Sequence, residues 1–241
     1  FSANPSAVCK SLQSKGLIKI IEKPVIPNIY NMSLESLPKK ISLTSEQQKS
    51  ISKVCSSLDK NSFDPFLLHG VTGSGKTEVF IEAAKHAIKQ GKSVVVLLPE
   101  ISTTPQIAGR FRSVFGDSVA VWHSKLSNSS RAWIWKKICE GEFKIIVGAR
   151  SAIFTPLKNL GLIIVDEEQE NAYKQTSSSP KYHAKEVSLM RGKINDATVI
   201  LSSATPSIES YYNYKSKKFK YLELPKRYGE AKLPHVHLVD M

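Results

Sequence analysis

The stretch Gly70-Val71-Thr72-Gly73-Ser74-Gly75-Lys76-Thr77 matches the pattern G-x-x-x-x-G-K-[ST] at every fixed position. It follows an apolar run and opens a segment of helical character, which is the context that this phosphate-binding motif requires. Glycines let backbone N–H groups wrap a phosphate, Lys76 reaches the β and γ phosphates, and the Thr77 hydroxyl can bind Mg²⁺. The predicted cofactors are therefore ATP and Mg²⁺, and the predicted contacts are Gly70, Thr72, Gly73, Ser74, Gly75, Lys76, Thr77 and Glu78.

Short apolar runs recur on both sides of this motif, at residues 66–68, 94–98, 145–147, 162–165 and 199–201. They are continuous rather than alternating, which is typical of parallel strands buried on both faces. Segments of helical character lie between them, such as 78–90, closed by Gly91, and 130–140, closed by Gly141. This order predicts an α/β domain with a mostly parallel sheet covered by helices on both faces.

A second group of candidate site residues follows the run 162–165. Asp166 and Glu167 come at the carboxyl end of that predicted strand, where ligands of open α/β sheets bind. Asp166 is the expected metal-side ligand together with Thr77, and Glu167 is expected to position and deprotonate an attacking water. The predicted catalytic set is thus Lys76, Asp166 and Glu167. The alternative, a solvated acidic helix start, is favoured for Glu170.

Charge and composition indicate the class of partner. The chain has 241 residues, with 34 Lys and Arg against 21 Asp and Glu, a formal net charge of +13. Basic side chains gain affinity for nucleic acids by releasing counterions from phosphates, although a solvated basic surface is the alternative. Three widely spaced cysteines give no CxxC pair, which favours reduced thiols. No apolar run is long enough to span a membrane.

The N-terminal part reads differently from the rest. A short polar helix from Asn4, then Gly16, then a β-branched strand over 17–21 is the order found at the end of a winged-helix module. Residues 1–30 are therefore expected to end such a domain, 31–43 to form a proline-containing linker, and 44–241 to form the main domain. Because the chain starts at Phe1 rather than Met, it is expected to be part of something longer.

The segment Ser202-Ser203-Ala204-Thr205-Pro206 follows the last apolar run, and superfamily 2 helicases carry a Ser-Ala-Thr segment at this place. The chain further resembles the PriA family of replication-restart helicases over about residues 41–230. The resemblance rests on the motifs at 70–78, 99–106, 123–124, 148–154, 166–168, 173–175, 182–184 and 203–206.

This resemblance implies the first RecA-like lobe of an ATP-dependent 3′-to-5′ DNA helicase that acts in primosome assembly at stalled forks. It implies Gln47 as the adenine contact, since an amide satisfies both a donor and an acceptor, with an ordinary polar helix start as the alternative. Thr103, Thr104, Arg150 and Ser151 would contact the phosphates of a DNA strand. Ser203 and Thr205 would link the nucleotide site to that strand.

The stretch from Tyr173 to Arg191 resembles the family's aromatic-rich loop, where rings stack on unpaired bases. The expected rings are Tyr173, Tyr182 and His183, with core packing as the alternative for each, and the expected cations are Lys174, Lys181, Lys185 and Arg191. Because the loop follows the acid pair closely, its movement on binding DNA would be transmitted to Glu167.

Three departures from the family pattern qualify the resemblance. Gln169 stands where the family usually has His, so it keeps hydrogen bonding but cannot titrate. Lys181 and Lys185 stand where Arg is common, which implies a weaker grip on the strand. A second lobe, an arginine finger and a cysteine-rich Zn²⁺ module are absent, so the isolated chain is expected to hydrolyse little ATP.

The resemblance also implies partners and a setting: single-stranded and forked DNA, primosome proteins, single-strand-binding protein, no membrane, and the bacterial cytoplasm. Two alternatives stay open. Another superfamily 2 DNA translocase would share the nucleotide motifs. A nucleotide-dependent switch or a small-molecule kinase would share only the phosphate loop, and would leave the basic charge unexplained.

Overall fold

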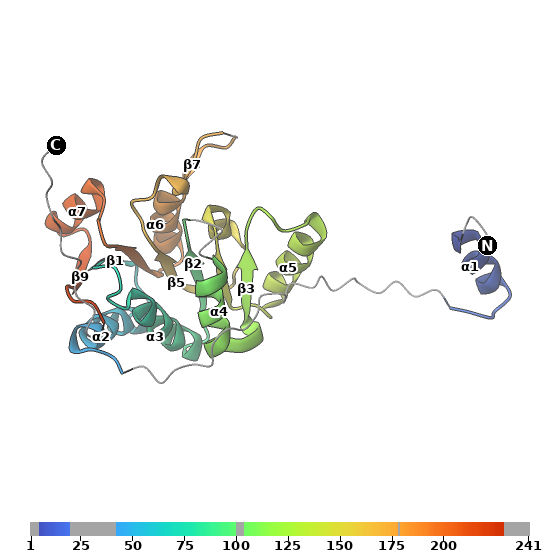
Figure 1. Ribbon diagram of the computed structural model, residues 1–241, viewed down its shortest axis with the longest axis horizontal. Helices are drawn as coiled ribbons and strands as arrows, with labels where there is room; N and C mark the ends of the chain where they lie inside the picture. The colour runs from blue at the N-terminus through green and yellow to red at the C-terminus, as the bar shows by residue number, and fades with distance from the viewer. Residues whose placement is uncertain (1–4, 20–41, 100–103, 178, 229–241) are drawn as a thin grey trace, which may run out of the picture.

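A computed structural model describes residues 5–19, 42–99, 104–177 and 179–228 of the protein, and Figure 1 shows their arrangement. Seven strands form one sheet in the order β3-β4-β2-β5-β8-β1-β9, and every neighbouring pair is parallel. Two further strands, β6 and β7, pair as an antiparallel hairpin. The strands are β1 (Asp64–Gly70), β2 (Ser93–Leu97), β3 (Val119–Trp122), β4 (Ile145–Gly148), β5 (Leu160–Val165), β6 (Lys174–Gln175), β7 (Tyr182–His183), β8 (Thr198–Ser203) and β9 (Lys220–Leu224).

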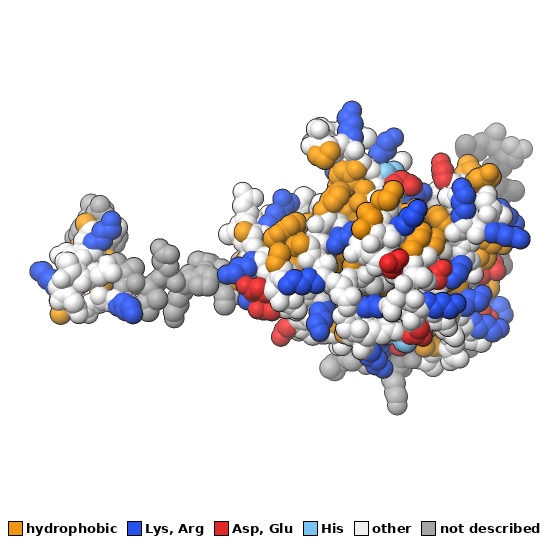
Figure 2. Space-filling view, turned by 180° about the vertical axis from the view of Figure 1, so that it is seen from behind, with side chains coloured by type: hydrophobic (Ala, Val, Ile, Leu, Met, Phe, Trp, Pro, Cys, Tyr) orange, Lys and Arg blue, Asp and Glu red, His pale blue; other side chains and the backbone are white. Residues whose placement is uncertain are grey.

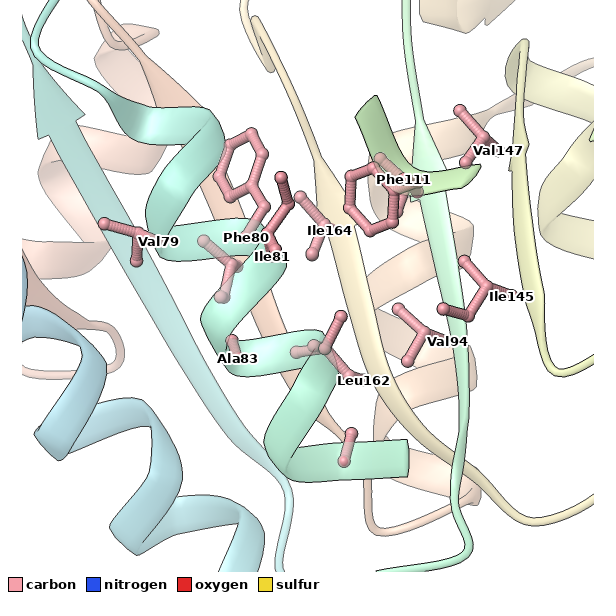
Figure 3. Packing of buried hydrophobic residues seen from close by; sticks show 14 of the residues in the cluster. Val79, Phe80, Ile81, Ala83, Val94, Phe111, Ile145, Val147, Leu162 and Ile164 are labelled. Atoms are coloured by element: carbon pink, nitrogen blue, oxygen red, sulfur yellow. The ribbon is translucent and has the colours of Figure 1, made fainter. Parts of the chain in front are cut away.

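Helices cover both faces of the sheet, as predicted. The helices of the described residues are α1 (Pro5–Ser14), α2 (Ser45–Asp59), α3 (Lys76–Lys89), α4 (Thr104–Phe115), α5 (Asn128–Glu140), α6 (Ala184–Ile194) and α7 (Ile208–Lys215), with short 3₁₀ helices η1 (Gly116–Ser118), η2 (Arg150–Phe154) and η3 (Asn171–Tyr173), and α1 contributes no residue to the two core clusters. Residues of α2, α3 and α4 pack on one face, and Figure 3 shows Phe80 and Phe111 of this cluster over Ile164. Residues of α5, α6 and η2 pack on the other face.

The strands alternate between these two clusters, which explains their continuous apolar runs. In β2, Val94 and Val96 belong to the cluster under α3, whereas Val95 and Leu97 belong to the opposite cluster. Both sets are fully buried. A strand buried on both faces cannot alternate apolar with polar residues, so the predicted α/β class is confirmed.

All five predicted strands are present, and β3 and β9 were missed. β9 lies at an edge of the sheet and reads Lys-Tyr-Leu-Glu-Leu, with Lys220 and Glu223 exposed, so it lacks a continuous apolar run. β3 lies at the other edge and spans only Val119–Trp122. The two predicted helices end where their glycines indicated, since Gly91 and Gly141 have positive φ values of 72° and 84°.

The N-terminal prediction is only partly met. The polar helix is present as α1, and Gly16 has a positive φ of 68°. The strand expected over 17–21 is not formed at Leu17–Lys19, since no strand among the described residues pairs with them, and its last two residues lie outside the described part of the chain. Leu17 is 69% exposed. The winged-helix assignment stays a prediction, and the linker expected at 31–43 is described only at residues 42 and 43.

Among the helices described, none combines the length and the apolar character needed to cross a bilayer.

Gly148, at the end of β4, provides a test of how closely β4 and β3 pack. A Cβ placed there would lie 2.1 Å from the backbone oxygen of Trp122, which cannot move away as a flexible side chain could. We expect Gly148→Ala to lower the free energy of unfolding by about 1–3 kcal/mol, measured by urea denaturation. Gly109→Ala in α4, where nothing lies within 4 Å, is the control and should be neutral or slightly stabilising. Equal effects of the two changes would contradict this packing.

Candidate nucleotide site

The phosphate loop joins the end of β1 to the start of α3. Gly73 and Gly75 have φ values of 78° and 80°, a backbone conformation that residues other than glycine rarely adopt. A Cβ on Gly75 would also lie 2.2 Å from Gln47 Nε2. Ser74 is buried, and its Oγ has no hydrogen-bond partner among the described residues. The loop is thus a close-packed backbone turn at a helix N-terminus, with a buried hydroxyl that a bound phosphate could engage.

Lys76 connects this loop to the acid pair. Its Nζ donates to the Gly70 carbonyl at 3.0 Å and lies 3.4 Å from Glu167 Oε1. The Lys76 side chain is only 10% exposed, whereas Glu167 is 35% exposed. The predicted juxtaposition of the loop and the acids on one edge of the sheet is therefore present.

Asp166 lies at the centre of the edge. Its Oδ1 accepts hydrogen bonds from Ser202 Oγ at 3.2 Å and from the Glu167 amide at 3.1 Å. Burial, together with the neighbouring Glu167 charge, raises the Asp166 pKa to about 6, and Lys76 only partly opposes this. A cation beside this carboxylate would relieve the cost of its charge. Thr77 and Asp166 supply the hard oxygen donors that Mg²⁺ prefers, so the residues present fit the metal.

Gln47 is placed against the loop rather than in open space. It is fully buried, and its Nε2 donates to the Ser74 carbonyl at 2.9 Å. Its Oε1 accepts from the Thr44 amide at 2.9 Å, completing a capping box at the start of α2. In this arrangement Gln47 braces the phosphate loop, and contact with adenine would require the loop to move.

A pocket beside the loop was not predicted. It has a volume of about 190 Å³ and is lined by Thr44, Glu46, Ser74, Leu224, Pro225, Lys226 and Arg227. The segment after β9 closes it, because the Tyr228 amide donates to the Gly73 carbonyl at 2.8 Å. The pocket could not be found from the sequence, since β9 itself gave no clear strand pattern.

Glu168 is the functional candidate that sequence reasoning missed. It is 1% exposed, and its carboxylate accepts from the Ser207 amide at 2.7 Å and from Ser210 Oγ at 2.8 Å. Lys185 Nζ, at the start of α6, lies 3.0 Å from Glu168 Oε2. The only sequence signal is the position of Glu168 directly after the acid pair.

This ion pair corrects the prediction for Lys185, which was expected to contact DNA. Its side chain is 9% exposed and bound to Glu168 and Ser207. Arg191 was also expected to be a free cation, but its guanidinium donates to the Ile153 and Thr155 carbonyls. Both basic groups donate to carboxylate or carbonyl oxygens within the fold, so they serve the structure.

Tyr173 corrects a second prediction. It was expected to stack on a base, but it is fully buried, and its hydroxyl lies within hydrogen-bond distance of the Leu97 and Asp166 carbonyls, between which its single proton is shared. Burial and the surrounding acids raise its pKa well above the usual value. The core-packing alternative holds for this ring, because its hydroxyl satisfies two strand-end carbonyls. Tyr173 ties the start of the loop to the carboxyl ends of β2 and β5.

The rest of the predicted loop forms the β6–β7 hairpin. Tyr182 is half-buried and packs edge-on against Phe154, with ring centroids 4.9 Å apart and Phe154 48% exposed. Lys174 and Lys181 are exposed, and His183 is half-buried. Arg150 Nη1 donates to the Ala172 and Lys174 carbonyls, so it holds the base of the hairpin. Tyr182, Lys174 and Lys181 thus remain candidates for DNA contact.

Four other predicted residues have defined places. Glu78 forms an ion pair with Arg110 of α4, which joins the phosphate-loop helix to the next helix. Ser203 is buried and accepts from the Thr205 amide at 2.8 Å, while Thr205 is exposed. Ser151 is half-buried in η2. Ser202, which was not singled out, makes the direct bond to Asp166, so it is the nearer link to the nucleotide site.

The second predicted DNA segment is only partly described. Thr103 lies outside the described residues, and Thr104 begins α4. The described residues also contain no group of three or more His, Cys, Asp or Glu side chains that could hold a metal by themselves.

Comparison with known proteins identifies the family. Residues 44–213 match the DEAD/DEAH box helicase family. Replication restart protein PriA of Chlamydia pneumoniae is 45% identical over 96% of the chain, and the Bacillus subtilis protein of the same name is 43% identical over 98%. The chain belongs to the PriA family. It spans 31% and 29% of the lengths of these two relatives.

Solved structures share the fold at lower identity. RecG bound to a three-way DNA junction superimposes with a TM-score of 0.61 and 22% identity, over 81% of this chain and 25% of RecG. The Hef helicase domain of Pyrococcus furiosus gives 0.51 and 20%, over 73% of this chain and 37% of Hef. The PriA-family chain therefore has the RecA-like fold of a helicase lobe, as predicted.

Gln169, where this PriA-family chain departs from the usual His, keeps a contact with the acid pair. Its Nε2 donates to Glu167 Oε2 at 3.1 Å. The expected retention of hydrogen bonding at this position is therefore seen in the geometry.

The raised pKa of Asp166 predicts that the free energy of unfolding depends on pH. Because the folded pKa, about 6, exceeds the ordinary value of 3.8, the contribution of this group to stability is greatest below pH 4 and is lost as the pH rises through 6. We expect Asp166→Asn to stabilise the magnesium-free protein above pH 6 by about 2 kcal/mol, and to do little near pH 4. Urea denaturation at a series of pH values measures this. Asp117→Asn, in the exposed 3₁₀ helix η1, is the control. A stability difference for Asp166→Asn that does not change with pH would contradict the raised pKa.

Proposed function

We propose that this chain is the ATP-binding lobe of an ATP-dependent 3′-to-5′ DNA helicase that acts in replication restart. The observation that carries the proposal is the distance of 3.4 Å between Lys76 Nζ and Glu167 Oε1, with Ser202 bonded to Asp166 beside them. This arrangement brings the phosphate loop, the acid pair and the Ser-Ala-Thr segment to one edge. Family membership and 45% identity to a replication restart protein support the same function.

Each residue at this edge has a chemical role in the proposal. Bound MgATP supplies the γ-phosphoryl group and the cation that offsets its charge. Backbone N–H groups at 73–77 and the Lys76 ammonium would hold the phosphates, while Thr77 and Asp166 would hold the metal. Glu167 orients the attacking water and accepts its proton, and the Gln169 amide keeps the Glu167 carboxylate in place.

Adenine is proposed to enter the pocket between Thr44 and Pro225. This pocket adjoins Ser74 of the phosphate loop, and its lining combines apolar Leu224 and Pro225 with polar Thr44 and Glu46. Gln47 contacts the same loop and could reach the base after the loop moves. Gln47 would therefore contact adenine only after this movement of the phosphate loop.

Single-stranded DNA is proposed to cross the same edge of the sheet. Tyr182, Lys174 and Lys181 of the hairpin would meet bases and phosphates, and Thr103, Thr104 and Ser151 would contact the backbone of the strand. Movement of the hairpin on binding DNA would be transmitted to the acids through two contacts. These are the hydrogen bond from Arg150 to the Ala172 carbonyl at the base of the hairpin, and the ion pair between Lys185 and Glu168. Thr205, exposed beside Glu168 and its serine partners, would sense the strand from the other side.

The wider setting is proposed from the family. Forked DNA, primosome proteins and single-strand-binding protein would be partners of the protein that contains this lobe, in the bacterial cytoplasm. Zn²⁺ is proposed only for a part of that protein beyond these 241 residues.

Lys76→Ala tests the nucleotide chemistry. In the protein that contains both lobes, we expect DNA-stimulated ATP hydrolysis to fall by about a hundredfold or more, because the cation on the γ-phosphate is lost. Lys85→Ala, on a more exposed side of the same helix, is the control and should leave the rate unchanged. A rate of ATP hydrolysis that does not change on adding DNA but requires a small acceptor molecule would favour a kinase or switch and contradict the proposal.

Tyr182→Ala tests the DNA contact. We expect the affinity for a fluorescent oligothymidylate to fall about fivefold or more, since base stacking is worth about 1–3 kcal/mol per base. The loss of stability should be smaller than for a fully buried ring, because Tyr182 is only half-buried against the core. Tyr173→Ala is the matched comparison, because it removes a buried ring and should lower the free energy of unfolding by about 3–5 kcal/mol. A large loss of stability with Tyr182→Ala would show that this ring is also a core residue.

A further inference from the structure

Helix α7 has an inverted arrangement of polar and apolar residues. Its buried residue is Ser210, 1% exposed, which donates to Glu168 at 2.8 Å. Its exposed residues are Ile208 at 86%, Tyr212 at 65% and Tyr211 at 42%. Together with Lys215, these residues form the α7 face, at positions i, i+3, i+4 and i+7 of one helix side.

The inversion follows from what α7 covers. Glu168 is a buried carboxylate that needs hydrogen-bond donors, so the inner side of α7 and its cap supply serine hydroxyls. Tyr214 packs half-buried against the core, and the side with Ile208, Tyr211 and Tyr212 is left facing out. A helix normally buries such a stripe, and exposed apolar side chains gathered on one helix face indicate a binding surface.

The rings of this surface are held in an ordered array. Tyr211 and Tyr214 pack edge to face at 5.7 Å, and Tyr214 stacks on Tyr221 of β9 at 4.3 Å with an interplanar angle of 17°. Lys215 Nζ lies 5.2 Å from the Tyr211 and Tyr214 ring centroids. Of the two exposed rings, Tyr211 is fixed by neighbours in this way and loses little conformational freedom when it binds a flat partner.

The array is also connected to the nucleotide edge. Tyr221 OH lies 2.8 Å from His69 Nδ1, and His69 Nε2 lies 3.2 Å from the Ala204 carbonyl in the Ser-Ala-Thr segment. In Figure 1, α7 and the hairpin both stand at the side of the sheet where its strands end. The α7 face is thus a second surface at this edge, separate from the hairpin.

Local charge favours an anionic partner. Between residues 207 and 221 there are four lysines, at 215, 217, 218 and 220, against one acid, Glu209. All four are exposed, although Lys220 pairs with Asp64. Figure 2 shows hydrophobic and basic side chains interspersed on the side of the molecule that carries α7. A face that only covered an apolar protein surface would not need this concentration of cations.

We infer that the α7 face binds single-stranded nucleic acid, with bases stacked on Tyr211 and Tyr212 and phosphates bound by Lys215, Lys217 and Lys218. Every base has an apolar face that can stack on a tyrosine, and neighbouring lysines neutralise the backbone without reading its sequence. This inference rests on the proposed function as a DNA motor. It adds a second contact that would hold the strand beside the Ser-Ala-Thr segment.

The test is the double variant Tyr211→Ala/Tyr212→Ala, which changes only exposed rings. We expect its affinity for a fluorescent oligothymidylate, measured by anisotropy, to fall about fivefold or more, whereas Tyr211→Phe/Tyr212→Phe keeps the rings and should retain affinity. Ile194→Ala, 74% exposed at the C-terminal end of α6, is the control for loss of an exposed apolar side chain. Changing Lys215 and Lys218 to Gln should reduce the salt dependence of log K by about 0.7 for each lysine.

Two outcomes would overturn the inference. If the wild type binds oligothymidylate and the double Ala variant binds it equally tightly, the α7 face does not bind the strand. The proposed function would not be affected by that result. If the double Ala variant changes only the oligomeric state or the thermal stability of the longer protein, the α7 face is covered by a protein surface rather than by nucleic acid. Failure of the wild type itself to bind oligothymidylate would instead contradict the proposed function.

Discussion

The order of three central strands is the constraint on which the site depends. β8 lies between β5 and β1, so the acids that follow β5 and the lysine that follows β1 are separated by the width of one strand. Lys76 reaches Glu167 across the end of β8, which closes with the small residues Ser202 and Ser203. The same strand end supplies the hydroxyl that bonds Asp166. One strand order thus brings the phosphate loop, the acid pair and the Ser-Ala-Thr segment into contact.

A second level of organisation depends on the buried carboxylate of Glu168. A buried charge is costly unless it is paired and hydrogen-bonded, and here Lys185, Ser207 and Ser210 meet that requirement together. These partners come from α6 and from the cap and first turn of α7. The acid motif is therefore joined to both elements that flank the nucleotide edge, and any shift of α6 or α7 changes the surroundings of its neighbour Glu167.

This network also explains the character of the two outer surfaces. Basic groups near the hairpin are divided: Lys185 and Arg191 are used inside, while Lys174 and Lys181 remain outside. Aromatic groups are divided in the same way, since Tyr173 satisfies strand-end carbonyls and Tyr182 lies at the surface. On α7, Ser210 is inside, Tyr214 is half-buried, and the rings of Tyr211 and Tyr212 are outside. In each of these cases the side chain that turns inward donates to a buried carboxylate or carbonyl oxygen.

Local patterns in the chain were enough to predict the α/β class, the five central strands, the phosphate loop and the acid pair, because each depends on neighbours in sequence: continuous apolar runs, glycines with positive φ, and acids at a strand end. They did not reveal β3 and β9, whose short or alternating edge sequences carry a weak signal. Which loop residues face inward, as Tyr173 and Lys185 do, was settled by folding, because that choice depends on carbonyl and carboxylate oxygens far away in the chain. The contact of Gln47 with Ser74 and the exposure of Tyr211 and Tyr212 on α7 were also settled by folding, because they depend on what α2 and α7 pack against.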